Sequence, residues 1–201
     1  MSKDYAEILP PKKTGKVIPK VVHQTHRSWE ALAPELLDNI EQLKRQNPDW
    51  EYRFYDDMAV ESYILKHYGT TILDYYRRID VRYGAARADL FRYLLIYNEG
   101  GVYLDIKSSF ATPIDSYLQP DDCFILSHWD NLKGQQHEGF GLFGGYADFP
   151  ERGEYQQFHI EAVAGHPLLR AVLLAVLEAI DNYSPFTHNV GRWGVFMSQG
   201  Q

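Results

Sequence analysis

The most informative stretch of the sequence is Arg87-Ala-Asp-Leu-Phe-Arg-Tyr-Leu-Leu-Ile-Tyr-Asn-Glu-Gly-Gly-Val-Tyr-Leu-Asp-Ile-Lys107. Apolar residues recur at helical spacing up to Asn98, and Gly100-Gly101 supplies the positive-φ residues that close a helix. A short β-prone run follows from Val102 to Ile106. Asp105 stands at the carboxyl end of this strand, the edge of the sheet where open α/β folds place ligands. We therefore predict that Asp105 contacts a ligand.

Two motifs in this stretch resemble a known family. Ala88-Asp89-Leu90-Phe91-Arg92 is similar to its helical Ser-Asp-x-x-Arg, and the run from Gly100 to Lys107 is similar to its Gly-Gly-x-Tyr-Leu-Asp-x-Asp. The family is that of retaining nucleotide-sugar glycosyltransferases with a DXD-type motif, glycosyltransferase family 32, which includes yeast initiating mannosyltransferases. The clostridial glucosylating toxins are more distant relatives. The resemblance extends upstream over residues 18–25 and 47–57.

The resemblance implies a fold, a reaction and a set of contacts. The fold is α/β, the single-domain GT-A type with a mostly parallel sheet flanked by helices. The reaction is transfer of a hexose from a nucleoside diphosphate sugar, a UDP- or GDP-sugar, to a hydroxyl of a glycan or other acceptor, with retention of configuration. In our mechanism Asp89 and Arg92 hold donor hydroxyls, Asp105 bridges ribose and sugar, and His23-Gln24-Thr25 border the nucleotide.

Simpler roles compete for some of these residues. Asp89 and Arg92 are three residues apart on a helix and so could form an ordinary structural ion pair. His23 could equally be a hydrogen-bonded core histidine. Trp129 and Asp130 follow a predicted strand and could present a ring and a carboxylate to the acceptor, or merely turn the chain.

Lys107 departs from the family motif, because the family has a second acidic residue at this position that ligates manganese or magnesium. Metal use is therefore in doubt. Asp105, the diphosphate and water could still hold a divalent ion weakly, and His188 could contact the metal or the diphosphate. Alternatively, the Lys107 ammonium itself neutralises the departing diphosphate, or it is a solvated loop lysine. A catalytically idle module that binds sugar nucleotides or glycans is the rival function.

Composition narrows the partners and the setting. The chain has 201 residues, 45% of them hydrophobic, and a net charge of −7, which argues against nucleic acid or an anionic membrane as a default partner. The single cysteine, Cys123, is expected to be a small buried hydrophobe. We find no apolar run of the ~20 residues that a membrane helix needs. The sequence thus predicts a cytoplasmic protein, or a soluble domain excised from an anchored enzyme.

Periodicity and turn residues divide the rest of the chain. Residues 1–16 are expected to be a flexible tail, and residues 17–201 the catalytic domain, with an irregular excursion over residues 128–153. We expect strands at residues 17–23, 51–55, 102–106 and 123–126. Helices are expected at residues 34–46, 56–68, 72–79, 87–98 and 167–182, with one helical turn at residues 114–118. Alternation of strands and helices predicts a largely parallel sheet.

Overall fold

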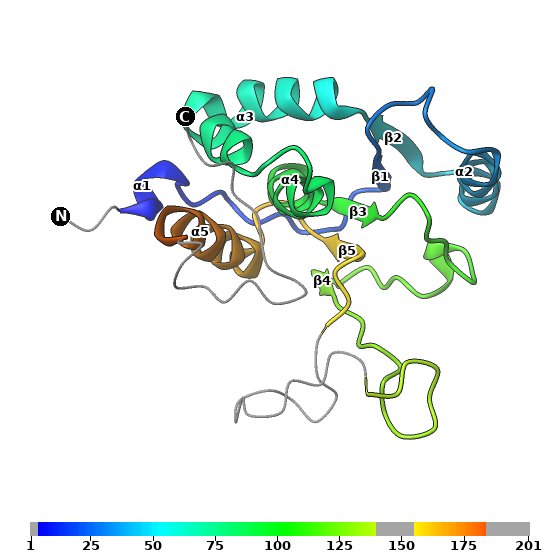
Figure 1. Cartoon of the computed structure of the whole chain (residues 1–201). Coiled ribbons are helices and arrows are strands. Elements are labelled where there is room, and N and C mark those ends of the chain that lie inside the picture. The colour runs from blue at the N-terminus through cyan, green and yellow to red at the C-terminus, as the bar shows by residue number, and fades with distance from the viewer. Residues whose placement is uncertain (1–3, 140–154, 184–201) are drawn as a thin grey trace.

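A five-stranded sheet organises the computed structural model, which describes residues 4–139 and 155–183 (Figure 1). The strand order is β2-β1-β3-β5-β4. The strands are β1 (Val21–Thr25), β2 (Glu51–Tyr55), β3 (Gly101–Leu104), β4 (Phe124–Ile125) and β5 (His159–Ala162). The helices are α1 (Tyr5–Ile8), α2 (Pro34–Gln46), α3 (Asp57–Arg78), α4 (Gly84–Glu99) and α5 (Pro167–Asn182), with the 3₁₀ turn η1 (Ile114–Ser116).

Most of the strands run in one direction. β1 pairs in parallel with both β2 and β3, whereas β5 is antiparallel to β3 and β4 is antiparallel to β5. β5 is therefore the strand that opposes the other four. The structure confirms the predicted α/β class with a mostly parallel sheet.

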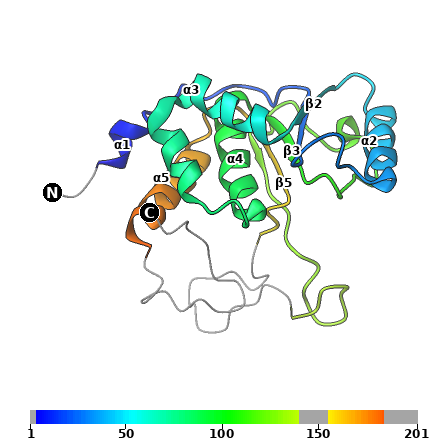
Figure 2. The ribbon, with the colours of Figure 1, turned by 45° about the horizontal axis from the view of Figure 1, so that its top comes forward.

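Helices cover both faces of this sheet. α3, α4 and α5 pack on one face, where Phe91, Tyr103 and Ile160 belong to one large apolar cluster (Figures 1 and 2). α2 and η1 lie on the other face, where Leu43 and Ile114 pack with strand residues in a smaller cluster. Successive side chains of a strand point to opposite faces, so β3 contributes Tyr103 to the first cluster and its two neighbours to the second.

The helix signals in the sequence locate the helices well. α2 and α5 have the predicted bounds, and each begins with a proline, a residue that suits the first helical turn because it has no N–H to leave unpaired. Asp56 caps α3 by accepting a hydrogen bond from the Ala59 N–H at 2.7 Å. Gly69, expected as a helix stop, interrupts the middle of α3 with φ 75° and ψ −175°, so α3 is a bent pair of helices.

The junction between α4 and β3 depends on two glycines with positive φ. Gly100 ends α4 at φ 73°, and Gly101 opens β3 at φ 95°. A Cβ on Gly100 would lie 2.6 Å from the backbone N of Ala164, and one on Gly101 would lie 2.7 Å from the carbonyl oxygen of Val21. These positions therefore need glycine both for backbone conformation and for space.

The amino-terminal segment differs from the prediction. Residues 4–16 were expected to be a tail, but they run along the domain and form α1. Leu9 is only 2% exposed, and Gly15 N–H donates to the Ala164 carbonyl at 2.7 Å. The first strand also begins at Val21 rather than Val17, since Pro19 cannot donate to a ladder.

Two further expectations around β4 and β5 need correction. β5 was not predicted, because it is four residues long and alternates His159 and Glu161 with apolar residues although all four are buried. Cys123 was expected to be buried and is exposed at the end of the loop before β4.

Among residues 4–139 and 155–183, no helix combines the length and the apolar character needed to cross a bilayer.

Gly100→Ala should destabilise the domain far more than Gly69→Ala. The two glycines have nearly the same backbone conformation, but a Cβ at position 69 has no atom within 4 Å. Both variants carry the φ strain of roughly 1–3 kcal/mol, and only Gly100→Ala adds overlap with backbone atoms. Urea unfolding should show a difference of at least ~1 kcal/mol. Equal losses in the two variants would contradict the close approach at Gly100.

Candidate active site

A cavity of about 550 Å³ opens at the carboxyl ends of β1, β2 and β3. Thr25, Asp57 and Asp105 line it where these three strands end, and the amino-terminal half of α4 forms one wall. Parallel strands place their carboxyl ends at one edge of the sheet, where ligand sites of α/β folds occur. Its other lining residues include Tyr76, Arg82, Arg87, Phe91, Arg92 and Lys107.

Arg92 is the buried centre of this site. Its side chain is 5% exposed, and its Nη2 lies 2.8 Å from Asp89 and 3.3 Å from Asp105. Nη1 donates to the backbone carbonyl of Gln157, and the guanidinium lies over the Tyr103 ring at 4.8 Å. Asp89, Arg92 and Asp105 thus lie together, as predicted, with one guanidinium paired to two carboxylates.

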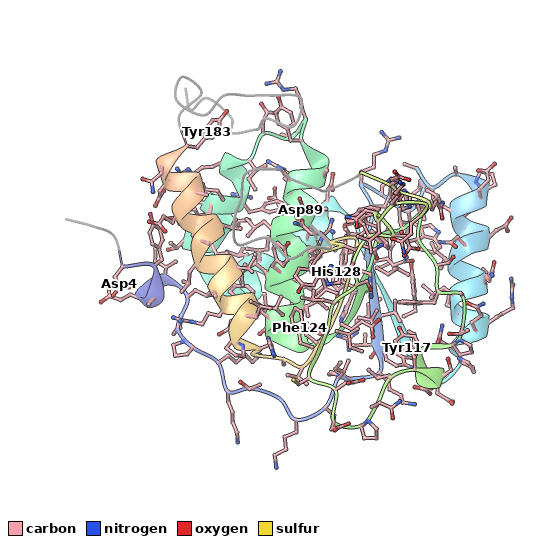
Figure 3. All side chains as sticks on the ribbon, turned by 90° about the horizontal axis from the view of Figure 1, so that it is seen from below. Asp4, Asp89, Tyr117, Phe124, His128 and Tyr183 are labelled. Atoms are coloured by element: carbon pink, nitrogen blue, oxygen red, sulfur yellow. The ribbon has the colours of Figure 1, made fainter. Side chains whose placement is uncertain are left out.

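The two carboxylates differ in their surroundings. Asp89 on α4 can be seen from below in Figure 3; burial raises its pKa, Arg92 opposes that rise, and the nearby charge of Asp105 adds to it. Asp105 is 27% exposed and lines the cavity. The ion pair expected as the simpler role does exist, but it does not exclude a ligand, because Asp105 keeps part of its surface open to the cavity.

The backbone around Asp105 is held from three sides. Asp105 N–H donates to the Phe158 carbonyl at 2.8 Å, and the Gln24 side chain donates to the Asp105 carbonyl at 3.3 Å. Asn39 on α2 donates to the carbonyls of Ile106 and Ser108 at 3.0 and 2.9 Å. This part of the loop is therefore fixed by strand, helix and side-chain amides.

The three residues of β1 that were expected to border the nucleotide lie differently from one another. Thr25 lines the cavity and donates from its hydroxyl to the Tyr55 carbonyl at 2.8 Å. Gln24 is fully buried and accepts from Tyr52 while it holds Asp105. His23 is also fully buried and does not line the cavity.

His23 is a hydrogen-bonded histidine of the core, which was the alternative to a role in bordering the nucleotide. Its Nδ1 lies 3.2 Å from the Tyr55 hydroxyl and its Nε2 lies 3.2 Å from the Gly100 carbonyl oxygen. Because the carbonyl can only accept, Nε2 carries the proton in the neutral ring. Burial lowers the pKa of His23 from its ordinary value to about 4.

Sequence reasoning identified Arg92 and Lys107 but missed three other cations of the cavity, Arg27, Arg82 and Arg87. Lys107 and Arg27 line it, and neither side chain makes a hydrogen bond or ion pair with the described residues. Arg82 pairs with Asp80 at 2.7 Å, and Arg87 donates to the Ile79 carbonyl at 2.9 Å. Arg27 lies just after β1, and this position is a sequence signal for a residue of the site. Arg82 and Arg87, before and within α4, carry no comparable signal.

Two predicted sites lie away from this cavity or outside the described residues. Trp129 packs edge-on against His137 and Phe158, with ring centroids 5.3 and 5.7 Å apart. The Asp130 side chain is exposed, and its backbone carbonyl accepts from the His137 N–H at 2.7 Å. Neither residue lines the cavity. His188 lies outside the described residues.

The donor atoms near Asp105 do not form a metal site by themselves. In the described part of the chain, no three His, Cys, Asp or Glu side chains are grouped to hold an ion. Asp105 already faces the Arg92 guanidinium, and Lys107 lines the same cavity with an ammonium. A divalent ion takes six or more oxygen ligands, so the described residues do not fit a Mn²⁺ or Mg²⁺ ion held by protein groups alone.

His23 should make the stability of the domain depend on pH. Its pKa is depressed in the folded state, so its contribution is complete above the unfolded value of 6.5 and is lost as the pH falls towards about 4. A shift of this size corresponds to roughly 3 kcal/mol. The difference in free energy of unfolding between the parent and His23→Gln should therefore change by about this amount between pH 7 and pH 4, measured by urea titration.

The exposed histidine His67 provides the control for this measurement. His67→Gln should follow the parent curve over the same pH range. If His23→Gln also ran parallel to the parent, the buried neutral imidazole would be excluded as the source of acid sensitivity.

Part of the chain is similar in sequence to known glycosyltransferases. Residues 34–125 match the family described as "Glycosyltransferase sugar-binding region containing DXD motif". The chain is 32% identical over 103 residues to inositol phosphoceramide mannosyltransferase 2 of Schizosaccharomyces pombe, covering 51% of this chain and 28% of that protein. It is 24% identical over 186 residues to the initiation-specific alpha-1,6-mannosyltransferase of Candida albicans, covering 84% of this chain and 45% of that protein.

A solved structure shares the fold. The PaToxG glycosyltransferase superposes with a TM-score of 0.58 at 15% identity, covering 88% of this chain and 64% of that chain. The chain spans less than half the length of the two curated relatives named above. Asp89, Arg92 and Asp105 all fall within residues 34–125, the part of the chain that is similar to the family of glycosyltransferases with a DXD-containing sugar-binding region.

Proposed function

We propose that this chain transfers a hexose from a nucleoside diphosphate sugar to a hydroxyl group of a glycan or lipid acceptor, with retention of configuration. The observation that carries the proposal is the position of Asp105: it directly follows β3, is fixed through its backbone and lines a cavity of about 550 Å³. Arg92 and Asp89 stand directly behind it. Cavities of this volume accommodate small molecules and cofactors.

The cavity is suited to an anionic donor although the whole chain is acidic. Arg27 and Lys107 contribute side chains without partners among the described residues, and Arg82 and Arg87 lie along the same wall. The first turn of α4 adds N–H groups with their partial positive charge. We assign these groups to the diphosphate, with Lys107 stabilising the negative charge that develops as the diphosphate departs.

The remaining roles follow from chemistry and position. Asp105 accepts hydroxyl hydrogens of the ribose and donor sugar, and Arg92 with Asp89 orients it and holds donor hydroxyls. Thr25 borders the nucleotide at the end of β1. His23 and Gln24 support the site from within the core.

A front-face substitution accounts for retention with these groups. The bond from the anomeric carbon to the diphosphate oxygen breaks while the acceptor oxygen forms a bond on the same face. The acceptor proton passes to the leaving phosphate oxygen. The described carboxylates lining the cavity are Asp57 and Asp105, and the contact of Asp105 with Arg92 suits binding better than nucleophilic attack.

The relatives support the nature of the sugar. Proteins similar to this chain are named as mannosyltransferases that act on inositol phosphoceramide or in alpha-1,6 linkage. A hexose donor is therefore the first to test, in the form of its GDP and UDP derivatives. Glycan and lipid acceptors follow from the same names.

Asp105→Asn should abolish transfer with little loss of stability. The substitution removes the negative charge but keeps the size, and Asp105 contributes a partly exposed side chain rather than packing. We expect kcat/KM to fall by roughly 100-fold or more, measured as nucleotide release from UDP- and GDP-hexoses with glycan or lipid acceptors. Asp121→Asn, which alters an exposed carboxylate in a distant loop, should leave kcat/KM unchanged.

Equal kcat/KM in Asp105→Asn and the parent would refute the assignment of Asp105. If the parent binds nucleotide in calorimetry but releases and transfers no sugar, the chain is the catalytically idle binding module instead.

Activity should depend only weakly on added metal. An ammonium at about 4 Å from a divalent ion opposes each unit of its charge by roughly 4 kcal/mol at an effective dielectric of 20. We expect EDTA to leave appreciable activity, Lys107→Ala to lower kcat, and Lys107→Asp to make activity respond to manganese. Lys66→Ala, on the exposed face of α3, is the matched control. Complete inactivation of the parent by EDTA, reversed by manganese, would show that other ligands hold an ion.

A further inference from the structure

A second cavity lies on the other side of the sheet from α4. It has a volume of about 350 Å³ and is lined by residues of β3, β4 and β5 and of the segments beside them. Three aromatic rings, those of Phe110, Tyr117 and Phe158, form its walls. Tyr117 can be seen in Figure 3 on the α2 side of the molecule. The polar lining residues are Ser109, Ser127, Gln156, His159 and Glu161.

Glu161 is the unusual member of this lining. It is 0% exposed in the middle of β5, a position at which a glutamate is rare unless it is paired. Its Oε1 accepts from the Tyr117 hydroxyl at 2.7 Å and lies 3.3 Å from His159 Nε2. Its Oε2 is buried and has no hydrogen-bond partner. A buried acceptor without a partner is costly, so a native structure that keeps one calls for an explanation.

The carboxylate and the aromatic walls together indicate the chemistry of a ligand. Phe110 packs near Tyr117 and edge-on to His159, with ring centroids 6.1 and 6.0 Å apart. Such rings offer flat apolar surfaces, and the free Glu161 oxygen can accept hydrogen bonds from hydroxyl groups. A ring with an apolar face and hydroxyl groups at its edge fits both features. The volume suits one hexose-sized ring with room for water.

The second cavity is next to the candidate active site. Leu104 lines the second cavity, whereas its neighbours Tyr103 and Asp105 line the first, because side chains alternate along β3. Phe158 lines the second cavity with its side chain and accepts the Asp105 N–H with its carbonyl. The segment from Asp105 to Phe110 therefore borders both cavities.

We infer that this second cavity binds the acceptor through one hexose-sized polyhydroxylated ring, with Glu161 Oε2 accepting its hydroxyl hydrogens. The identification of the ring as acceptor rests on the proposed function. The binding of such a ring does not, since it depends only on Glu161 and the aromatic walls.

Ligand-observed NMR on the full chain can test the binding without turnover. The probes are the methyl glycosides of mannose, glucose and galactose, and myo-inositol, each at millimolar concentration without donor. At least one should bind, and Glu161→Gln should weaken it about tenfold or more, as expected when a hydrogen bond to a charged acceptor is lost. Glu35→Gln, an exposed carboxylate on α2, should bind like the parent. UDP and GDP should not displace the probe.

Stability measurements separate a binding role from a structural one. Glu161→Gln should keep or raise the melting temperature, because it removes a buried charge. Phe110→Ala is a second binding-defective variant that leaves the carboxylate in place. Binding of no probe, equal binding by Glu161→Gln and the parent, or displacement of the probe by nucleotide would each overturn the inference.

Kinetics then distinguish the two proposals. If transfer occurs, Glu161→Gln should raise KM for the acceptor at least several-fold more than KM for the donor, and an unchanged acceptor KM would overturn the acceptor assignment. If no transfer occurs but Glu161-dependent ring binding persists, the sugar site stands and the transferase proposal fails.

Discussion

The ion pair centred on Arg92 joins the parts of the molecule that matter for the site. One guanidinium contacts a carboxylate on α4, a carboxylate after β3 and a carbonyl just before β5. This nearly buried cation would be strongly destabilising if both carboxylates were lost, whereas either carboxylate alone still compensates its charge. The motif residues thus hold the helix, the central strand and the antiparallel strand in register. Arg92 and Asp105 also line the cavity, so these two residues serve both the architecture and the site.

The central strand separates two kinds of surroundings. Residues of β3 point alternately to the α4 face and to the α2 face, and each set borders its own cavity. A strand of four residues with a glycine at its start can present side chains accurately to both cavities only if its backbone is fixed. The close approach of Gly101 to Val21 and the amides of Gln24 and Asn39 supply that fixation. Chemical groups on the two sides are therefore placed by a single rigid segment.

The sequence predicted the elements whose signals are local. Helices α2 and α5 begin with proline and carry one apolar face, and Asp56 is a capping residue, so the bounds could be read directly. Asp105 could be singled out because it directly follows a buried strand, at the edge of the sheet where α/β folds place ligands, and it does line a cavity there. In contrast, β5 is stabilised by pairing with strands far along the chain, and its residues His159 and Glu161 do not look like a buried strand. The same non-local pairing explains why the second cavity could not be foreseen.

Prediction of the site from the sequence was limited in a similar way. Whether His23 and Gln24 reach the cavity depends on the face of β1 that each occupies and on how deeply each is buried. Their positions in the sequence do not reveal the depth of burial. Arg27, Arg82 and Arg87 come together only because the ends of β1 and α3 meet the start of α4. The amino-terminal residues are held by the domain, since Leu9 is buried and the Gly15 N–H donates to the Ala164 carbonyl, although their polar composition suggests a tail. Contacts of this kind arise from the assembled domain.

The bend at Gly69 lets one helix contribute residues from both of its ends to the candidate active site. Asp57 and Tyr76 belong to the same element, α3, and both line this cavity. In a straight helix, 19 residues at 1.5 Å each would separate their backbones by about 28 Å. Because α3 bends at this glycine (Figure 1), residues near both of its ends line the same cavity. The backbone conformation of one glycine, which does not itself line the cavity, thereby brings two distant parts of one helix to the same site.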